Sequence, residues 1–511
     1  MFSKVYSGGV RGIDGYLVHV EADVGTGLPG IHLVGYLSSA VREAQDRVRT
    51  AIKNSGFHLP PMKVTINLSP ADIRKEGNAF DLPIAIAILA AHKLINADEL
   101  ADAAFVGELG LNGEIKPVHG TISLVEAFRQ AGIKRCFLPA DNVMEGMVIG
   151  GITIYRAKRL NELIAGLQAP VLLVPETATE ESGAESELQL PDYRDVNGQL
   201  LLRRATEVAV AGQHNILYIG PAGSGKSMMA RRIPGIMPPL TREERLQLSK
   251  IYSVGGMLPP GKAVLSTRPF RNPHHTISPM ALAGGGAVPK PGELSLASGG
   301  VLFLDEFAEF QKRTLEVLRQ PLEEHRIRLS RVHGVYDFPA DFMLAAATNP
   351  CPCGFYPDRN RCTCDEMQVR RYLGRISRPL IDRIDICVEA TPITYEEVQS
   401  KTVNESSLEI RKRIQQAYIV QQKRFAGTNL HFNSEMQNPE IKEYCRLSPE
   451  DNRFFKQVFQ TMQLSARGYF KILKVARTIA DLAGSERINR SHLSEAVGYR
   501  RLEEKYWGNG G

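Results

Sequence analysis

The chain has 511 residues, of which 43% are hydrophobic and 23% charged, so it describes a globular protein with about three or four domains. No run of eighteen apolar residues occurs and the first residues lack the apolar core of a signal peptide, so we expect a cytoplasmic protein with no membrane partner. The formal charge of +6 permits binding of nucleic acid without requiring it.

Residues 1–168 alternate short β-type runs with helical patterns, which predicts a compact α+β domain. Its β-type runs lie at 16–24, 63–68, 103–109 and 135–139, and its helical patterns at 39–55 and 81–92. The first helical pattern brings Arg42, Arg49 and Lys53 near one face, which a solvated surface explains as well as a ligand contact does.

Residues 169–190 are acidic, rich in Ser, Thr and Ala, and free of aromatic residues, which predicts a solvated linker. Residues 191–393 then predict an α/β domain, and residues 394–511 a helical region.

The α/β domain opens with an apolar strand that runs into a glycine-rich turn of the form G-x-x-x-x-G-K-[ST]. In this motif backbone N–H groups converge on phosphate oxygens, the lysine reaches the β and γ oxygens, and the hydroxyl ligates Mg²⁺. The predicted phosphate-binding residues are Gly220, Pro221, Ala222, Gly223, Ser224, Gly225, Lys226 and Ser227. Because no motif for guanine recognition is found, we expect ATP and Mg²⁺ as the ligands.

Two later strands bring polar groups to the same place. Four apolar residues at 301–304 are followed by Asp305 and Glu306, as expected of a buried parallel strand that ends at the ligand-binding edge of a sheet. Asp305 would complete the Mg²⁺ shell and Glu306 would polarise the attacking water. The strand at 342–348 ends at Asn349, whose amide is placed to orient that water.

Two insertions could contact DNA. One is the Gly/Pro-rich segment 279–293, which contains Lys290, and the other is the segment 325–339, in which Arg326, Arg328 and Arg331 interleave with apolar residues as in a hairpin. Closely spaced cations suit the phosphates of a nucleic-acid strand. An exposed hairpin whose charges prevent aggregation is the alternative.

Four of the seven cysteines fall within fourteen residues, as Cys351, Cys353, Cys362 and Cys364. In a reducing compartment such a cluster favours tetrahedral Zn²⁺, although the C-x-C arms are shorter than the usual C-x₂-C, and free thiols in a loop remain the alternative. His274 and His275 lack partners at ligand spacing, so we expect a structural or inter-subunit role for them.

Phosphate loop, acidic strand, polar strand tip, a Pro-Leu-x-Asp-Arg turn and a helical lid with a basic residue together resemble an AAA+ ATPase. In that superfamily ATP lies between neighbouring subunits. The resemblance therefore implies that Arg383 acts as an arginine finger in trans and that Arg467 acts as the sensor-2 arginine, with Arg477 as its rival. A surface ion pair is the alternative for both arginines.

Longer matches narrow the resemblance. The chain resembles the magnesium-chelatase-like branch of AAA+ proteins in the segments 268–286, 291–306 and 346–354. Within that branch it is similar to the ComM/YifB family, as the segments 9–35 and 465–482 indicate, and this resemblance extends over essentially the whole chain. Ala222, Ser227 and the segment 36–41 depart from the usual family residues without removing a needed atom. The resemblance implies a ring, usually a hexamer, that hydrolyses ATP while it translocates single-stranded or branched DNA and migrates branches during natural transformation, with recombination proteins as partners.

The N-terminal domain resembles a Lon protease domain at residues 107–139. Lon chemistry needs a serine nucleophile and a lysine base, but Ala79 and Leu124 occupy the two matching positions. We therefore expect an inactive platform that forms the ring or contacts DNA. A chelatase-type motor that remodels a protein partner is the second functional hypothesis, and a peptidase is the last.

Overall fold

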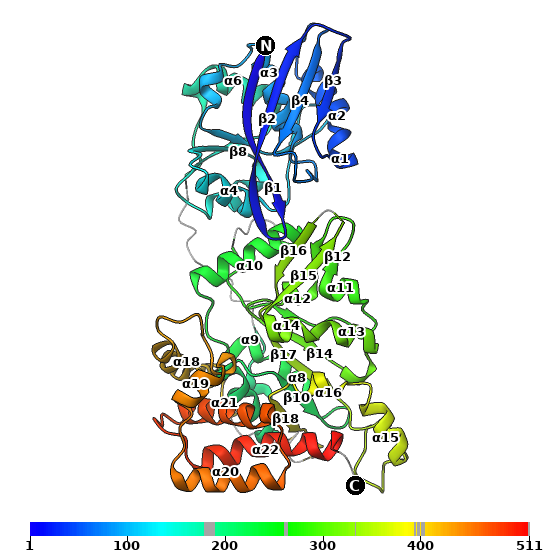
Figure 1. Ribbon diagram of the computed structural model, residues 1–511, viewed down its shortest axis with the longest axis vertical. Coiled ribbons are helices and arrows are strands. Elements are labelled where there is room, and N and C mark those ends of the chain that lie inside the picture. The colour runs from blue at the N-terminus through cyan, green and yellow to red at the C-terminus, as the bar shows by residue number, and fades with distance from the viewer. Residues whose placement is uncertain are drawn as a thin grey trace.

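The computed structural model describes residues 1–177, 190–259, 264–332, 334–392, 395, 399 and 404–508 (Figure 1). The molecule is elongated, with the N-terminal domain at one end, an α/β domain in the middle and a group of helices at the other end. This is the predicted class of fold: an α+β domain, an αβα domain with a phosphate loop, and a helical C-terminal region. The boundaries drawn between the domains stay predictions.

The N-terminal domain is built on a mixed seven-stranded sheet with the strand order β3-β4-β2-β1-β5-β8-β9. Its strands are β1 (Phe2–Arg11), β2 (Asp14–Gly25), β3 (Gly30–Val34), β4 (Lys63–Ser69), β5 (Ala103–Phe105), β8 (Arg135–Pro139) and β9 (Thr153–Ala157), with β6 (Glu108–Leu109) and β7 (Ile115–Lys116) as a separate small hairpin. β1 and β2 form a long antiparallel hairpin that ends in the pair Arg11 and Asp14. Each predicted β-type run lies in or across one of these strands.

The helices of this domain are α1 (Ser39–Arg42), α2 (Ala44–Asn54), α3 (Asp81–Ala91), α4 (Thr121–Gln130), α5 (Val143–Met147) and α6 (Leu160–Gln168). All eleven residues of α3 are buried, as expected of a helix that is apolar on nearly every side. The single helix predicted at 39–55 is two helices that meet at Glu43. Ser38 caps the start of α1, and the ψ of −16° at Glu43 departs from the regular helical value, which interrupts the helix before α2.

The middle domain contains a parallel five-stranded sheet with the order β11-β14-β17-β10-β18. The strands are β11 (Phe270–Arg271), β14 (Val301–Leu304), β17 (Met343–Thr348), β10 (Ile216–Ile219) and β18 (Ile386–Glu389). β10, β14 and β17 are buried at every position, because helices cover both faces of such a sheet. The helices are α7 (Leu200–Gly212), α8 (Lys226–Arg231), α9 (Ile233–Ile236), α10 (Arg242–Gly255), α11 (Pro279–Ala283), α12 (Glu293–Leu296), α13 (Lys312–Glu316), α14 (Pro321–Glu324), α15 (Glu366–Leu373) and α16 (Arg378–Ile381).

Two hairpins project from this domain toward the N-terminal domain (Figure 1). One pairs β12 (Gly284–Gly285) with β13 (Lys290–Pro291), and the other pairs β15 (Arg326–Arg331) with β16 (Gly334–Pro339). The second is the hairpin predicted at 325–339; its turn residue His333 lies outside the described residues.

The C-terminal helices are α18 (Ser407–Arg424), α19 (Asn438–Tyr444), α20 (Pro449–Thr461), α21 (Ala466–Leu482) and α22 (Arg490–Trp507). α21 packs against α7, α18 and α22, and its buried face follows the 3.6-residue period of an amphipathic helix. α22 also packs against β18, so the helical region and the sheet share one core.

The N-terminal domain rests on the middle domain through two contacts. Helix α10 packs on α4, where Lys250 forms an ion pair with Glu126 and the Ser253 hydroxyl donates to Glu145 at 2.6 Å. The turn between β1 and β2 packs on β16. The predicted linker begins with a 3₁₀ turn, Pro170–Leu172, and a bridge from Pro175 to β9, whereas residues 178–189 lie outside the described part of the chain.

Candidate functional site

The phosphate loop leaves the C-terminal end of β10 and enters α8, as the motif predicts. Gly223 and Gly225 adopt φ angles of +76° and +84°, which side chains with a Cβ rarely adopt. Gly220 has a different reason to be glycine, because a Cβ there would lie 2.5 Å from the carbonyl oxygen of Ala390. The three glycines therefore allow a tight turn beside the end of β18.

Lys226 is buried at the base of this loop, with 7% of its surface exposed. Its ammonium group donates to the carbonyl oxygens of Gly220 and Pro221, both at 2.7 Å, and to Asn349 Oδ1 at 3.3 Å. Burial lowers the pKa of this lysine to about 8, although the nearby carboxylate of Asp305 opposes the shift. The lysine is therefore a desolvated cation, held in place for an anion.

Asp305 and Glu306 follow β14 and have different surroundings. The Ser227 hydroxyl donates to Asp305 Oδ2 at 2.6 Å, which joins the two predicted Mg²⁺ ligands. Glu306 lies in the left-handed region with φ +53°, and its half-exposed carboxylate is 3.1 Å from His275 Nδ1. The two carboxylates therefore have different partners: Asp305 contacts Ser227, and Glu306 contacts His275.

Asn349 follows β17, the strand between β14 and β10, so its amide reaches Lys226 from the adjacent strand tip. The structure thus brings Lys226, Ser227, Asp305, Glu306 and Asn349 to one edge of the sheet. Pro221, Ala222 and Ser224 complete the loop, in which the Ser224 hydroxyl donates to the Pro221 carbonyl oxygen at 2.8 Å.

Arg383 lies at the opposite edge of the same sheet. Its carbonyl oxygen accepts a hydrogen bond of 3.0 Å from Asn215, the residue that precedes β10, whereas the phosphate loop follows β10. The Arg383 guanidinium donates to Glu323 Oε1 at 2.5 Å. Arg383 therefore faces away from the phosphate loop of its own chain.

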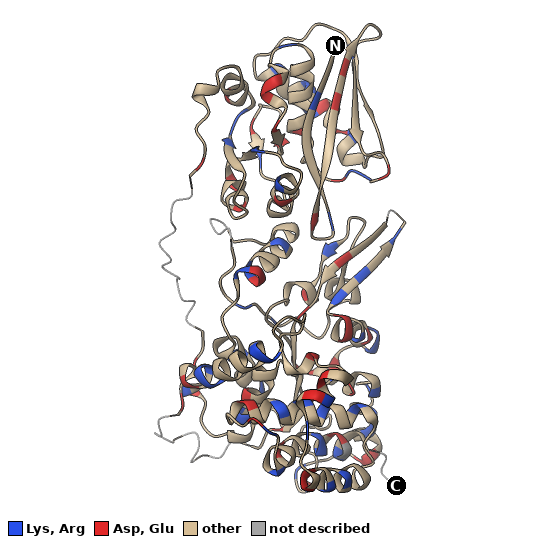
Figure 2. Ribbon diagram, turned by 60° about the vertical axis from the view of Figure 1, so that its left-hand side comes forward, with Lys and Arg blue, Asp and Glu red and all other residues tan. Residues whose placement is uncertain are grey.

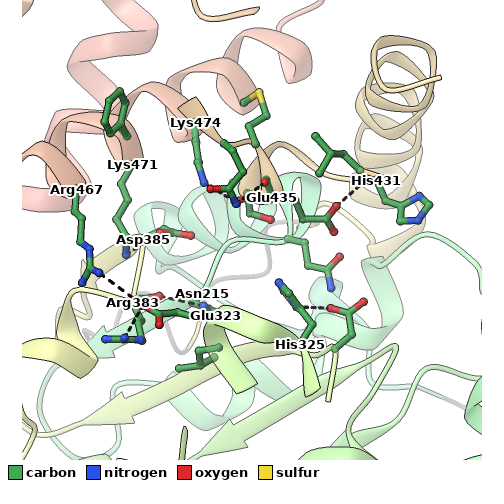
Figure 3. A pocket seen from close by; sticks show the side chains of 18 of the residues that line it. Asn215, Glu323, His325, Arg383, Asp385, His431, Glu435, Arg467, Lys471 and Lys474 are labelled. Atoms are coloured by element: carbon green, nitrogen blue, oxygen red, sulfur yellow. Dashed lines mark hydrogen bonds and ion pairs between the residues drawn. The ribbon is translucent and has the colours of Figure 1, made fainter. Parts of the chain in front are cut away.

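Arg467 shares the surroundings of Arg383. Both line a cavity of about 620 Å³ between the sheet and the C-terminal helices (Figure 3). Arg467 is exposed, with its guanidinium 3.9 Å from the same Glu323 carboxylate. Its rival Arg477 is buried, with an ion pair to Asp481 at 3.0 Å and hydrogen bonds to two carbonyl oxygens. Of the two candidates, only Arg467 is open to a ligand or a neighbouring subunit.

The same cavity contains a buried charged network. Asp385 lies 2.9 Å from Lys471 and 3.2 Å from His214. Burial raises the pKa of the Asp385 carboxyl, but the charges of Lys471 and His214 outweigh burial and hold this pKa well below its usual range. The network fixes α21, which carries Arg467, to the N-terminal edge of β18.

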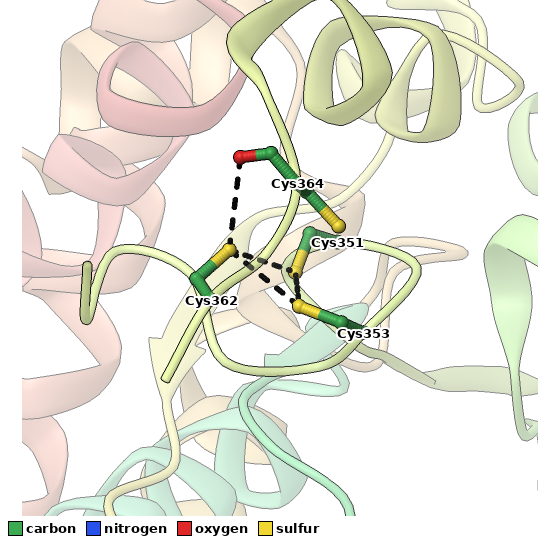
Figure 4. A group of neighbouring side chains, drawn as sticks. All are labelled: Cys351, Cys353, Cys362 and Cys364. Atoms are coloured by element: carbon green, nitrogen blue, oxygen red, sulfur yellow. Dashed lines mark hydrogen bonds between the residues drawn. The ribbon is translucent and has the colours of Figure 1, made fainter. Parts of the chain in front are cut away.

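The four clustered cysteines meet in the loop between β17 and α15 (Figure 4). The sulfurs of Cys351, Cys353 and Cys362 are 3.3, 3.5 and 3.8 Å apart, and all four sulfurs lie within 4.8 Å of one another. Four thiolates around one Zn²⁺ at 2.3 Å would have sulfurs about 3.8 Å apart. The three distances above lie within about 0.5 Å of that value, so the set of thiols is compatible with a tetrahedral zinc site.

The loop that carries these cysteines also lies against the nucleotide site. It starts directly after Asn349, and a Cβ on Gly354 would contact the backbone nitrogen of Ala222 at 3.9 Å. On its other side Tyr356 packs edge-on against Tyr506 of α22 at 6.3 Å.

The three hairpin arginines do not form one stripe. Arg326 and Arg328 lie on one face of β15, and each has a carboxylate partner, Glu324 at 3.5 Å and Asp337 at 2.9 Å. Arg331 is an odd number of residues away from both, so it lies on the other face, beside β12. Figure 2 shows these basic positions along the hairpin.

The two Lon-like positions are apolar in the structure as in the sequence. Leu124 is buried and Ala79 packs against the same apolar cluster. The N-terminal domain therefore offers neither a nucleophile nor a base at these positions.

Three residues of the sites were missed or underrated from the sequence. His275 follows β11, which pairs with β14 in parallel, so His275 and Glu306 lie at the same edge of the sheet. A strand of only two residues has no periodic pattern by which the sequence could reveal it. Glu323 is one of two adjacent glutamates in the four-residue helix α14, and the sequence does not distinguish it from its neighbour. Arg11 belongs to the turn between β1 and β2, and only the packing of two distant hairpins reveals its position.

Comparisons with known proteins cover nearly the whole chain. The family model of magnesium chelatase subunit ChlI matches residues 192–398, that of subunit ChlI of Mg-chelatase matches 20–142, and that of the ChlI C-terminal region matches 404–500. Competence protein ComM of Haemophilus influenzae is 40% identical over 98% of this chain and 97% of its own. Protein YifB of Escherichia coli is 42% identical over the same shares. An archaeal Lon protease of Archaeoglobus fulgidus is 31% identical over 25% of this chain and 21% of its own.

Among the described residues, no helix is long and apolar enough to cross a membrane.

Proposed function

The chain belongs to the ComM/YifB family of magnesium-chelatase-like AAA+ proteins, and from this we propose that it is an ATPase whose subunits form a ring that moves along DNA. The ring is expected to be a hexamer in the cytoplasm. The observation that carries the proposal is the division of the nucleotide machinery between the two edges of one sheet, with the phosphate loop and acids at one edge and Arg383 and Arg467 at the other.

Such a division fits an enzyme that completes each active site with a neighbouring subunit. Lys226 and the N–H groups of the loop would hold the ATP phosphates. Glu306 would accept a hydrogen bond from the attacking water and polarise it, while Asn349 would orient this water. Ser227 and Asp305 would hold Mg²⁺, which supplies charge neutralisation at the β and γ phosphates; their oxygens already lie 2.6 Å apart. Arg383 and Arg467 of the next subunit would stabilise the charge that develops on the γ-phosphate.

A head-to-tail arrangement of this kind generates rings. In each copy Glu323 stands beside both arginines, so it would hold them ready until a phosphate group with more negative charge replaces it. Arg383 and Arg467 both approach Glu323, at the edge of the sheet opposite to the phosphate loop of the same chain.

DNA as the track is supported by the basic hairpins and by the relative named for competence. Arg326, Arg328, Arg331 and Lys290 would grip backbone phosphates, which gives binding without sequence preference. We propose that single-stranded and branched DNA taken up in natural transformation is the substrate, with recombination proteins as partners, as the resemblance to the ComM/YifB family implies. The activity would be branch migration or strand separation driven by ATP.

Zn²⁺ is proposed as a structural cofactor in the cysteine loop. The donor set is four thiolates at tetrahedral spacing, and two of the four, Cys351 and Cys364, are buried. Bound zinc would fix the loop between the strand tip that carries Asn349 and helix α22.

The test compares ATP hydrolysis without DNA, with single-stranded DNA and with forked DNA, and follows displacement of a labelled strand. DNA-stimulated hydrolysis with strand movement is expected of the wild-type protein, and binding without movement is expected of Glu306→Gln.

The match to chelatase subunits favours a second function, the ATP-driven remodelling of a protein partner. Hydrolysis that ignores every DNA but responds to a protein partner would decide for that second function.

A further inference from the structure

The turn between β1 and β2 of the N-terminal domain is built into the hairpin β15–β16 of the ATPase domain. Arg11 Nε donates to the carbonyl oxygen of Val335 at 3.2 Å, and its guanidinium lies 5.8 Å from the ring centre of Tyr336. A Cβ on Gly12 would lie 2.6 Å from the Asp337 carbonyl oxygen, so the two backbones are in close contact. Ile13 is buried in one apolar cluster with Tyr336 and Phe338.

This contact carries Arg11 to the tip of the other hairpin. A Cβ on Gly334 would lie only 2.5 Å from Arg11 Nη2, and Gly334 is the cross-strand partner of Arg331. The Arg331 guanidinium in turn lies beside β12, where a Cβ on Gly285 would be 3.3 Å from its Nη2. Gly285 pairs with Lys290 of β13. Three hairpins from two domains therefore bring Arg11, Arg331 and Lys290 onto neighbouring positions.

The charges of these three residues are not balanced nearby. All three are exposed, and among the residues that the structure describes none of them has a carboxylate within ion-pair distance. Arg326 and Arg328 differ in this respect, because Glu324 and Asp337 already neutralise them on the other face of the hairpin. Bringing three unpaired cations together costs free energy, which a polyanion offsets, because the three cations replace counterions that are condensed on its phosphates.

The arrangement also distinguishes a nucleic acid from a small anion. The cations extend along hairpin tips rather than around a pocket, and backbone phosphates recur along a strand with a spacing that successive exposed cations can follow. We propose that Arg11, Arg331 and Lys290 form one site for the DNA backbone, in which the inactive Lon-like domain supplies a direct DNA contact. This rests on the proposed function as a DNA motor and assigns the N-terminal domain a part in it.

Arg11→Gln tests the site, because glutamine can still donate a hydrogen bond to Val335 while it removes the charge. Arg11→Lys keeps the charge, and Arg49→Gln removes an exposed arginine of the same domain on α2, away from the hairpins. Binding of a fluorescent single-stranded oligonucleotide is measured from about 50 to 200 mM salt. Each phosphate contact adds about −0.7 to the slope of log K against log salt concentration, so each contact accounts for a nearly threefold loss of affinity over this range.

Arg11→Gln is expected to bind severalfold more weakly than wild type with a shallower salt slope, whereas Arg11→Lys and Arg49→Gln keep the wild-type slope. Lys290→Gln should resemble Arg11→Gln, and Arg328→Gln should have the smaller effect. The melting temperature should not change in Arg11→Gln or Arg49→Gln, and basal ATP hydrolysis should not change in the Arg49→Gln control. Wild-type slope and affinity in Arg11→Gln, in a protein that does bind DNA, would overturn the inference and leave the motor intact. A wild-type protein that binds no DNA would overturn both.

Discussion

The position of Arg383 leads to a quantitative prediction about mixed assemblies. Its carbonyl oxygen accepts a hydrogen bond from Asn215, which immediately precedes β10. From Asn215 to the first residue of the phosphate loop the chain advances five residues at about 3.3 Å each, so the two ends of β10 lie about 16 Å apart. An arginine side chain cannot span this distance within one subunit. Arg383→Ala should therefore bind ATP normally and hydrolyse it poorly, because the missing group belongs to the neighbouring site.

Mixing Arg383→Ala with Glu306→Gln subunits should then restore activity. An interface works when the subunit with the nucleotide retains Glu306 and its neighbour retains Arg383. For random mixing in equal amounts this pairing occurs at about one quarter of the interfaces, so hydrolysis should reach about one quarter of the wild-type rate if the sites act independently. The assay is phosphate release over a series of mixing ratios, and the rate should peak at the equal mixture.

The double variant Glu306→Gln with Arg383→Ala provides the control. Mixed with either single variant it can form no complete site, so the rate should stay at background throughout. Subunit exchange must be shown independently, with two fluorescent labels. If exchange is complete and the single variants still give background rates at every ratio, Arg383 does not act on a neighbour's nucleotide, and the reasoning from the sheet edges is wrong.

Further predictions concern the nucleotide, the metal and the core. Lys226→Ala should lose nucleotide binding, while Glu306→Gln should keep it and slow hydrolysis by orders of magnitude; a fluorescent ATP analogue measures the first and phosphate release the second, and near-wild-type turnover in both would contradict the site. Purified protein should contain about one Zn²⁺ per chain by elemental analysis, and Cys362→Ser should lower both the zinc content and the melting temperature. Wild-type protein that contains no metal after expression in zinc-replete cells would exclude the zinc site. Asp385→Asn should lower the free energy of unfolding by about 3–5 kcal/mol near pH 7, because Lys471 stays buried without its partner. The folded-state pKa of Asp385 is depressed, so the difference between the variant and the wild type should shrink as the pH falls below about 4. Urea unfolding near pH 7 and below about pH 4 measures this difference.

The sequence predicted the parts of the fold that have a strong local signal. The glycines of the phosphate loop, the apolar strand before Asp305 and the tip at Asn349 carry their chemistry in consecutive residues, so their meeting at one sheet edge follows from parallel strand topology. The helical character of the C-terminal region was predicted as well, and the buried face of α21 follows a 3.6-residue period. The Cys cluster was visible from composition, and its near-tetrahedral spacing was not.

Contacts between segments far apart in the chain could not be predicted. Glu43 divides a helix that looked continuous, because its ψ of −16° departs from the regular helical value, and apolar periodicity does not reveal such a local change of the backbone. The hairpin arginines looked equivalent in sequence, yet strand alternation places Arg331 on the other face, and Asp337 neutralises Arg328 across the strand pair. His275 and Arg11 depend on pairings that a single sequence does not encode in any local pattern.

The end of helix α22 has a practical consequence. Trp507 is the only tryptophan of the chain, and its indole N–H donates to the carbonyl oxygen of Leu373 at 3.1 Å, within the apolar cluster that includes Cys351 and Cys364. Tryptophan fluorescence therefore has a single emitter. This emitter lies beside Tyr506, which packs against Tyr356 of the loop that carries the four thiols. Loading or stripping of metal should be readable as a spectral change in unlabelled protein, whereas an affinity tag fused at this end of the chain would disturb the reporter.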